Sequence, residues 1–273
     1  MYSKVLLDRR LIVILLFFAF IFIGCEKVPA SKKVVATTSF IGTIAKAIGK
    51  DRVNVVTLVP GGMCPGHFDL KPDDILAITD AMIILNHGWE MWIKFLNSME
   101  KKGSIRTINI QGSWMIPEVH IRVTNEITRI LAEVDPQNSK WYEKNSVIYK
   151  REVELATIKV KEEVKPFQNV KAVSSEHQAE FLRWLGFDVV ATYKRPEELT
   201  PKGLIEIIQR AKREGVQVVV DNLQSGPKTG EQIAIEIGAR HVVLTNFPLG
   251  DSYIGCLKEN VGKVIKACKW QGL

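Results

Sequence analysis

The sequence lacks the motifs of several common catalytic centres. It contains no Gly-x-Ser-x-Gly elbow, no phosphate-binding glycine loop and no His-Glu-x-x-His pair. Its basic residues form no arginine-rich run with interleaved aromatic side chains, although the net charge is +7. We therefore expect neither an enzyme nor a nucleic-acid-binding protein.

The chain also lacks a hydrophobic run long enough to cross a membrane comfortably. The longest run, residues 11–24, is charge-free but shorter than the roughly 20 residues of a span. It follows a short basic segment, as in a secretory signal, and Phe22-Ile23-Gly24-Cys25 resembles a lipoprotein lipobox. We predict a signal peptide over residues 1–24 and lipidation of Cys25, with an uncleaved anchor as the alternative. Either places the rest of the chain outside the cytoplasm, tethered to a membrane.

Cysteine is scarce, with four residues in all. If Cys25 is lipidated, three remain and at most one disulfide can form. Cys256 and Cys268 would lie about 18 Å apart in one unbroken helix, too far for a bridge. A bridge between them needs a break near Gly262, so no pairing is favoured.

What the sequence does contain is an alternation of β-branched runs and helical patterns. It predicts strands followed by helices on both sides of one long helix, and therefore an α/β fold of two lobes with mainly parallel sheets. The predicted strands are 34–39, 53–59, 82–86, 107–110, 171–175, 187–193, 216–221 and 241–246.

The long helical pattern, residues 136–167, has no glycine, and no proline between Pro136 and Pro166, where it ends. Trp141, Ile148 and Leu155 recur every seven residues, with Val153 and Val160 beside them, which predicts an amphipathic helix of roughly 28 residues. We interpret it as a rigid strut between the lobes.

These patterns divide the chain into a signal peptide and four further segments. The segments are a tether (25–33), an N-terminal lobe (34–135), the linking helix (136–167) and a C-terminal lobe (168–273). Ligands of parallel sheets bind beyond the carboxyl ends of the strands. We therefore expect the segments after the strands of both lobes to line one cleft.

Four stretches resemble the metal-type (zinc/manganese cluster) substrate-binding proteins of ABC importers. The first, VPGGMCPGHFDLKPDDI (residues 59–75), is similar to the first ligand-bearing loop of that family. The others are LAEVDPQNSKWYEKN, VVVDNLQSGPK and VVLTNFPLG. The resemblance covers residues 34–270 and implies a binding protein with partners in an ABC permease and its ATPase. It also implies a monomer, with a divalent metal, zinc or manganese, as the transported ligand and no organic cofactor.

The family's metal ligands are not all present at the aligned positions. The first two histidines fall on Gly66 and Gly112, the third ligand falls near Glu176 and His177, and an aspartate falls on Asn246. Three interpretations compete: a metal site rebuilt from shifted ligands, a larger ligand such as a metal chelate or organic molecule, and loss of binding. For the first, the predicted ligands are His67, Glu176 (or His177) and Asp221.

For other side chains the sequence gives weaker indications of a function. Cys64 is expected to support the loop, and His87 to have a capping or core role with the cleft as the alternative. His120 is expected at the surface and His241 away from the cleft. Trp89 and Trp92 are expected in the core, with Trp89 as an alternative floor of the pocket.

The function that combines these points is capture of a divalent metal ion in the cleft and delivery to the permease. The alternatives are a binder of a larger chelate or organic solute, and an adhesive or signalling lipoprotein that retains the fold.

Overall fold

Two four-stranded sheets form the framework of the part of the chain that the computed structural model describes, residues 31–92, 94 and 104–269. The predicted signal peptide, Cys25 and most of the tether lie outside the described residues. The strands are β1 (Lys32–Thr38), β2 (Val53–Val59), β3 (Ile83–Asn86), β4 (Ile105–Thr107), β5 (Lys171–Ser175), β6 (Asp188–Tyr193), β7 (Val218–Asn222) and β8 (Arg240–Leu244).

Both sheets are wholly parallel in their described pairs. The first has the order β2-β1-β3-β4 and the second β6-β5-β7-β8. The central strands are therefore β1 and β3 in the first sheet and β5 and β7 in the second. Strands such as β7, which is buried at every residue, read as continuous β-branched runs because helices cover both faces. The predicted α/β class with two mainly parallel sheets is confirmed. Strand β4 lies two residues earlier than predicted.

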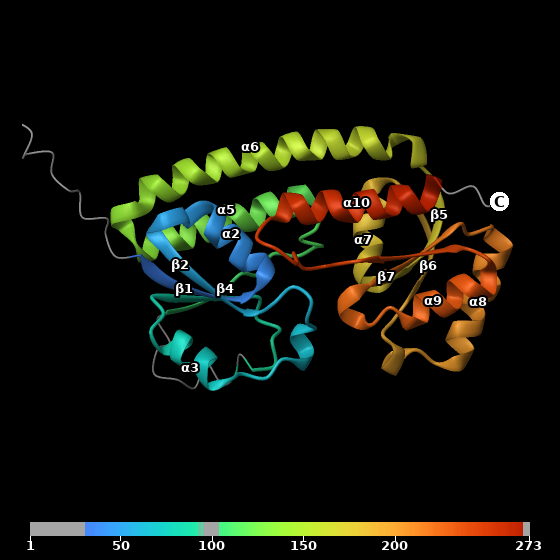
Figure 1. The fold of residues 1–273 in the computed structure, drawn as a ribbon, viewed down its shortest axis with the longest axis horizontal. Coiled ribbons are helices and arrows are strands. Elements are labelled where there is room, and N and C mark those ends of the chain that lie inside the picture. Colours follow the sequence, from blue (N-terminus) through green and yellow to red (C-terminus); the bar gives the residue numbers. More distant parts are fainter. Residues whose placement is uncertain (1–30, 93, 95–103, 270–273) are drawn as a thin grey trace, which may run out of the picture. The chain divides into compact units, whose positions relative to one another are not determined.

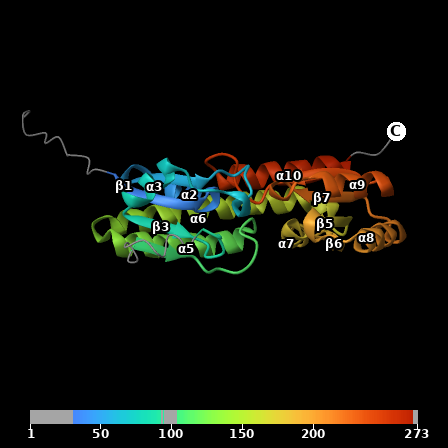
Figure 2. The same ribbon diagram turned by 90° about the horizontal axis from the view of Figure 1, so that it is seen from below.

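Helices follow the strands and cover the sheets in layers (Figures 1 and 2). The helices are α2 (Ser39–Gly49), α3 (Pro72–Thr79), α5 (Pro117–Val134), α6 (Ser139–Val164), α7 (Glu176–Leu185), α8 (Pro201–Glu214), α9 (Lys228–Ile237) and α10 (Tyr253–Lys269). One large apolar cluster joins residues of α2, α5, α6, α7 and α10 to both sheets. Smaller clusters lie on the opposite faces, with α3 on the first sheet and α8 and α9 on the second.

The long helix α6 passes along both sheets in Figure 1, with 26 residues against the roughly 28 predicted. Its buried face differs from the predicted heptad. Val153 and Val160 are buried as predicted, but Ile148 and Leu155 are exposed, and Tyr142 and Tyr149 are buried in their place. Polar residues share that buried face because they have partners; for example, the Asn145 amide donates to the Ile48 carbonyl at 2.9 Å.

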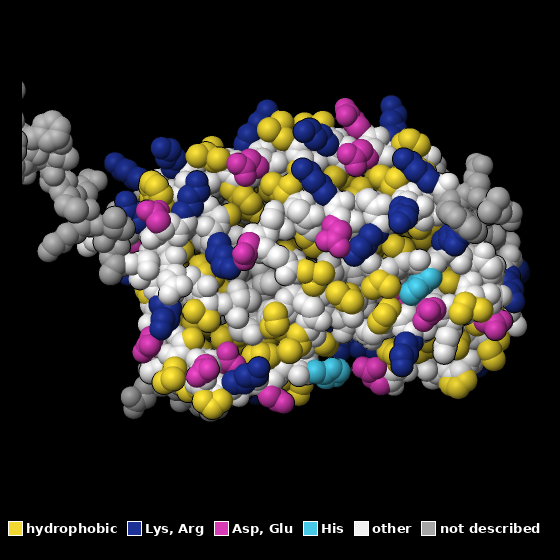
Figure 3. Space-filling model, viewed as in Figure 1, with side chains coloured by type: hydrophobic (Ala, Val, Ile, Leu, Met, Phe, Trp, Pro, Cys, Tyr) yellow, Lys and Arg dark blue, Asp and Glu magenta, His cyan; other side chains and the backbone are white. Residues whose placement is uncertain are grey.

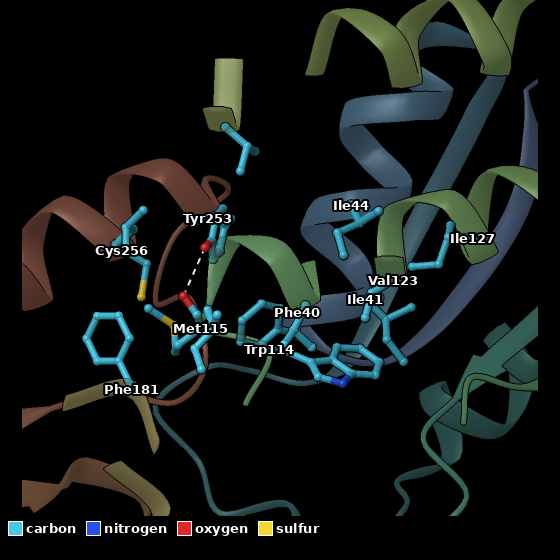
Figure 4. Close-up of a cluster of buried hydrophobic side chains, with 14 of the residues drawn as sticks. Phe40, Ile41, Ile44, Trp114, Met115, Val123, Ile127, Phe181, Tyr253 and Cys256 are labelled. Carbon is cyan, nitrogen blue, oxygen red and sulfur yellow. Dashed lines mark hydrogen bonds between the residues drawn. The ribbon is translucent and has the colours of Figure 1, made fainter. Parts of the chain in front are cut away.

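The C-terminal helix α10 packs against β8 of the second sheet and also against helices α2 and α6 (Figure 4). The Tyr253 hydroxyl donates to the Met115 carbonyl at 2.9 Å, and its ring lies 6.0 Å from that of Phe40. Because α10 runs unbroken through Gly262, Cys256 and Cys268 do not pair, and both are free.

No helix among the described residues is long and apolar enough to cross a membrane. On the face drawn in Figure 3, basic and acidic side chains are interspersed rather than gathered by sign.

Candidate functional site

A cavity of about 900 Å³ lies at the carboxyl ends of the strands of both sheets. Segments after β2, β3, β4, β5, β6, β7 and β8 all contribute to its lining, together with Phe40 of α2. This confirms the expected cleft, because parallel strands of one sheet end at the same edge. The lining includes Cys64, Gly66, His87, Trp89, Gly112, Ser113, Trp114, Glu176, His177, Glu180, Arg195, Asn222, Gln224 and Asn246.

One wall of the cavity is aromatic. The ring of His87 lies between two tryptophans, with its centroid 4.9 Å from Trp89 and 4.3 Å from Trp114. Trp89 is 53% exposed although it lines the cavity, so the expectation that it belongs to the core is wrong and the floor of the pocket is its place. Trp92 instead packs against Phe68 at 6.0 Å. The cavity therefore presents an indole face to any ligand that enters.

The aromatic wall is held by a buried carboxylate. Glu90 is 2% exposed and accepts hydrogen bonds from the His87 and Gly88 amides and from the Thr37 hydroxyl. His87 Nε2 lies 2.8 Å from the Thr38 hydroxyl. Burial lowers the pKa of His87 to about 4, against the opposing charge of Glu90, so the ring is neutral near pH 7. His87 therefore both makes a supporting contact with Thr38 and lines the cleft.

Acidic groups come from the first turns of α7. Glu176 Oε1 lies 4.0 Å from His177 Nε2, and both residues line the cavity. Glu180, one turn later, accepts a hydrogen bond from the Ser113 amide at 2.7 Å. Burial is the main cause that lowers the pKa of His177, followed by the charge of Arg195. Helical spacing places Glu176 and Glu180 on one face, so sequence reasoning could have found Glu180.

A guanidinium group also enters the cavity. Arg195 follows β6, and its Nε lies 3.4 Å from His177 Nε2. Its other side passes the glycine loop, where a Cβ at position 66 would be 3.9 Å from Arg195 Nη1. Among the described residues, no carboxylate lies within the 4.0 Å of an ion pair with this guanidinium. Sequence reasoning missed Arg195, whose only signal was its place after a strand end.

Amide side chains near the carboxyl ends of β5, β7 and β8 are hydrogen-bonded to one another and to their neighbours. Gln178 Nε2 donates to Asn222 Oδ1 at 3.0 Å and to Asn246 Oδ1 at 2.7 Å. Gln224 Nε2 donates to the Gly61 carbonyl and to the Thr245 hydroxyl. These hydrogen bonds hold the side chains of the cavity wall in place and join the wall to the loop after β2, through the Gly61 carbonyl.

The three predicted metal ligands are not brought together. His67 is exposed in the turn Pro65–His67 and is outside the cavity lining, whereas Glu176 lines it. Asp221 is 1% exposed and accepts from the Tyr193 hydroxyl at 2.6 Å, with His241 Nε2 at 2.9 Å. Within residues 31–92, 94 and 104–269, no three His, Cys, Asp or Glu side chains form a group that could hold a metal ion. Coordination by this set stays a prediction.

Two further histidine expectations have clear outcomes. The expectation of a surface His120 is wrong: its side chain is fully buried, stacked on Tyr253 at 3.5 Å between centroids and 2.8 Å from the Tyr149 hydroxyl. It is buried because α5 turns this face toward α6 and α10. His241 lies outside the cavity lining, as expected.

The positions that the resemblance aligns with family ligands converge on the cavity. Gly66, Gly112, Glu176 and Asn246 all line it. Gly112 has a φ of +103°, and a Cβ there would lie 3.2 Å from Glu180 Oε1. The places of the missing imidazoles are thus bordered by Arg195 and Glu180 from the second half of the chain.

Comparison with known families finds one match that covers most of the chain. The family described as zinc-uptake complex component A periplasmic (ZnuA) matches residues 34–267.

Two relatives from streptococci are similar over nearly the whole chain. The metal ABC transporter substrate-binding lipoprotein SloC of Streptococcus mutans is 26% identical over 286 residues, covering 89% of this chain and 93% of that protein. The manganese ABC transporter substrate-binding lipoprotein scaA of Streptococcus gordonii is 27% identical over 273 residues, covering 85% and 87%.

A solved structure shares the fold. A crystal structure of a zinc-bound ZnuA 138–173 deletion mutant superposes with a TM-score of 0.76 at 24% identity, covering 89% of this chain and all of that one.

Proposed function

This chain belongs to the zinc-uptake complex component A periplasmic family, and from that premise we propose that it is the extracytoplasmic solute-binding component of an ABC importer. Its role is to capture a divalent metal ion of the zinc, manganese or iron type in the cleft and to deliver it to the permease and ATPase. The role is binding and release, without catalysis.

The observation that supports this proposal is the convergence of strand ends. Seven strand ends from two parallel sheets meet at one cavity, and the four aligned ligand positions all lie in its lining. A site made from two sheets can enclose a solute between them and release it when they separate. This is the arrangement that a carrier needs.

Within the cavity, Glu176 and His177 are the donors we propose for the ion. A carboxylate and an imidazole are ligands that zinc and manganese accept in proteins. The two groups are already 4.0 Å apart. For His67 or Asp221 to join them, the glycine-rich loop or the hydrogen bonds at the end of β7 would have to rearrange.

We further propose that lipid on Cys25 tethers the protein to the membrane and that it works as a monomer. The relatives SloC and scaA are named as lipoproteins of ABC transporters, which supports the tether. Release of the protein from membranes by Cys25→Ser would test it.

Metal titration of the purified protein tests the cargo. Zinc, manganese and iron(II), each supplied as the chloride, are titrated by calorimetry, and the bound metal is counted by elemental analysis. We expect one ion per chain. Glu176→Gln should weaken binding by about tenfold or more, since even groups that only support metal ligands contribute 10–100-fold. Glu236→Gln, an exposed carboxylate of α9 outside the cavity lining, is the matched control.

His67→Ala separates the cavity from the loop as the source of ligands. Unchanged affinity would restrict the ligands to the cavity lining, and lost affinity would identify His67 as a ligand. The absence of binding by all three metals would refute the proposed cargo.

A further inference from the structure

Arg195 is out of place in a cleft for a bare cation. Its guanidinium carries a fixed positive charge at any physiological pH and repels a divalent ion. Within the described part of the chain, its one hydrogen bond joins Nε to His177 Nε2, at the long distance of 3.4 Å. Arg129, by contrast, pairs with the carboxylates of Glu126 and Glu133.

The remaining donors of Arg195 form a planar fork that suits one chemistry. Two parallel N–H groups match the two oxygens of a carboxylate, and such charge-assisted pairs are among the stronger hydrogen bonds in proteins. Gly66 has no side chain to cover this fork, whereas a Cβ at that position would lie 3.9 Å from Arg195 Nη1 and 3.7 Å from Cys64 Sγ, in van der Waals contact with both. An anionic group of the ligand can therefore reach the guanidinium.

The size and the aromatic wall of the cavity also indicate a molecule rather than an ion. Pockets for small molecules have volumes of roughly 300–1,000 Å³ and are lined by aromatic side chains with a few polar groups. This cavity has about 900 Å³. Trp89 is 53% exposed and is backed by His87, so its indole offers a rigid apolar face.

We propose that the cleft binds a small, flat, carboxylate-bearing molecule, free or coordinated to a divalent metal, with its carboxylate on Arg195 and its face against Trp89. A metal held by the same molecule would meet Glu176 and Glu180, the acidic groups of the cavity. The inference rests on the proposed function for one point, that the cargo enters this cleft.

Matched pairs of small probes test the role of the charge. Benzoate and pyridine-2-carboxylate are compared with benzamide and pyridine-2-carboxamide by ligand-observed NMR on the purified protein, with and without zinc chloride. We expect the carboxylates to bind and the amides to bind at least about tenfold more weakly. An increase in pyridine-2-carboxylate affinity on adding zinc would identify the chelate as the preferred form, and no increase would identify the free acid.

Three variants locate the binding in the cleft. Arg195→Ala should weaken carboxylate binding by about tenfold or more, and Trp89→Ala should weaken carboxylates and amides alike. Arg213→Ala, an exposed arginine of α8 outside the lining, removes the same charge and should change nothing. The fold of each variant is checked by its thermal unfolding.

The outcomes distinguish this inference from the proposed metal cargo. Carboxylates that bind no better than amides, or that bind Arg195→Ala as well as the wild type, would overturn the inference. So would the absence of binding by every carboxylate up to about 5 mM. Zinc binding that tightens in Arg195→Ala would then uphold a bare-ion cargo. Carboxylate binding in a protein that takes no zinc would uphold the inference and refute the metal.

Discussion

His120 makes the folded protein sensitive to acid. The imidazole is fully buried among Phe40, Tyr149 and Tyr253, and burial lowers its pKa from the ordinary 6.5 to about 3. In the unfolded chain the same group takes up its proton near pH 6.5. The unfolded state therefore binds more protons below this pH, and stability falls as the pH falls from 6.5 toward 3.

The size of the effect follows from the two pKa values of His120. Each pH unit between them is worth about 1.4 kcal/mol, so the loss relative to pH 8 is about 1 kcal/mol at pH 5.5 and about 3 kcal/mol at pH 4.5. Well above pH 6.5 the group is neutral in both states and contributes no pH dependence. His87, whose pKa is lowered to about 4, acts in the same direction over an overlapping range.

The double variant His120→Phe with Tyr149→Phe isolates the contribution. It removes both partners of the 2.8 Å hydrogen bond and retains a ring against Tyr253. Because neither partner is left unpaired, its stability at pH 8 should be within about 1.5 kcal/mol of the wild type. Tyr149→Phe alone leaves His120 without this partner and should cost about 1–3 kcal/mol.

Urea unfolding at several pH values and constant ionic strength provides the measurement. We expect the double variant to lose about 3 kcal/mol less than the wild type between pH 8 and pH 4.5, with the remaining slope due to His87 and the carboxylates. An unchanged slope in the double variant would refute the assignment of acid sensitivity to His120.

Two smaller predictions concern the second sheet and its helices. Gly230→Ala should lower the free energy of unfolding by about 1–3 kcal/mol, because the added Cβ would clash with Asp221 Oδ2 and the Tyr193 hydroxyl. Thermal unfolding would measure the loss of stability. An unchanged stability would mean that this buried cluster can shift freely. Thr200→Ala should cost about 1 kcal/mol, since the Thr200 hydroxyl accepts from the Gly203 amide at the start of α8; Thr200→Ser is the control that should retain most of the stability.

The parallel α/β architecture could be predicted because its signals are local. Buried parallel strands read as short β-branched runs, and the helices between them carry their own caps and glycine stops. Thr200 and Gly215 at the two ends of α8 are examples. The place of the cleft followed from the same reading, since chain direction alone brings the ends of parallel strands to one edge.

The faces of the helices could not be predicted as well. The apolar heptad of α6 pointed to Ile148 and Leu155, but the structure exposes both and buries Asn145 and Ser146. A polar side chain can be buried wherever a partner satisfies it, and that partner belongs to another element. For the same reason His120 lies in the core, where the Tyr149 hydroxyl of α6 is its partner.

By itself, the sequence determined the two parallel α/β halves, the long helix between them, the family and the edge at which ligands bind. All of these depend on periodicity, on chain direction or on short motifs. Only the tertiary structure decided which side chains meet in the cleft: Glu180 reaches Ser113 across 67 residues of chain, and Arg195 reaches His177 and the loop at Gly66. Such contacts depend on how the two sheets face each other. No local pattern in the chain encodes which residues from distant segments will meet.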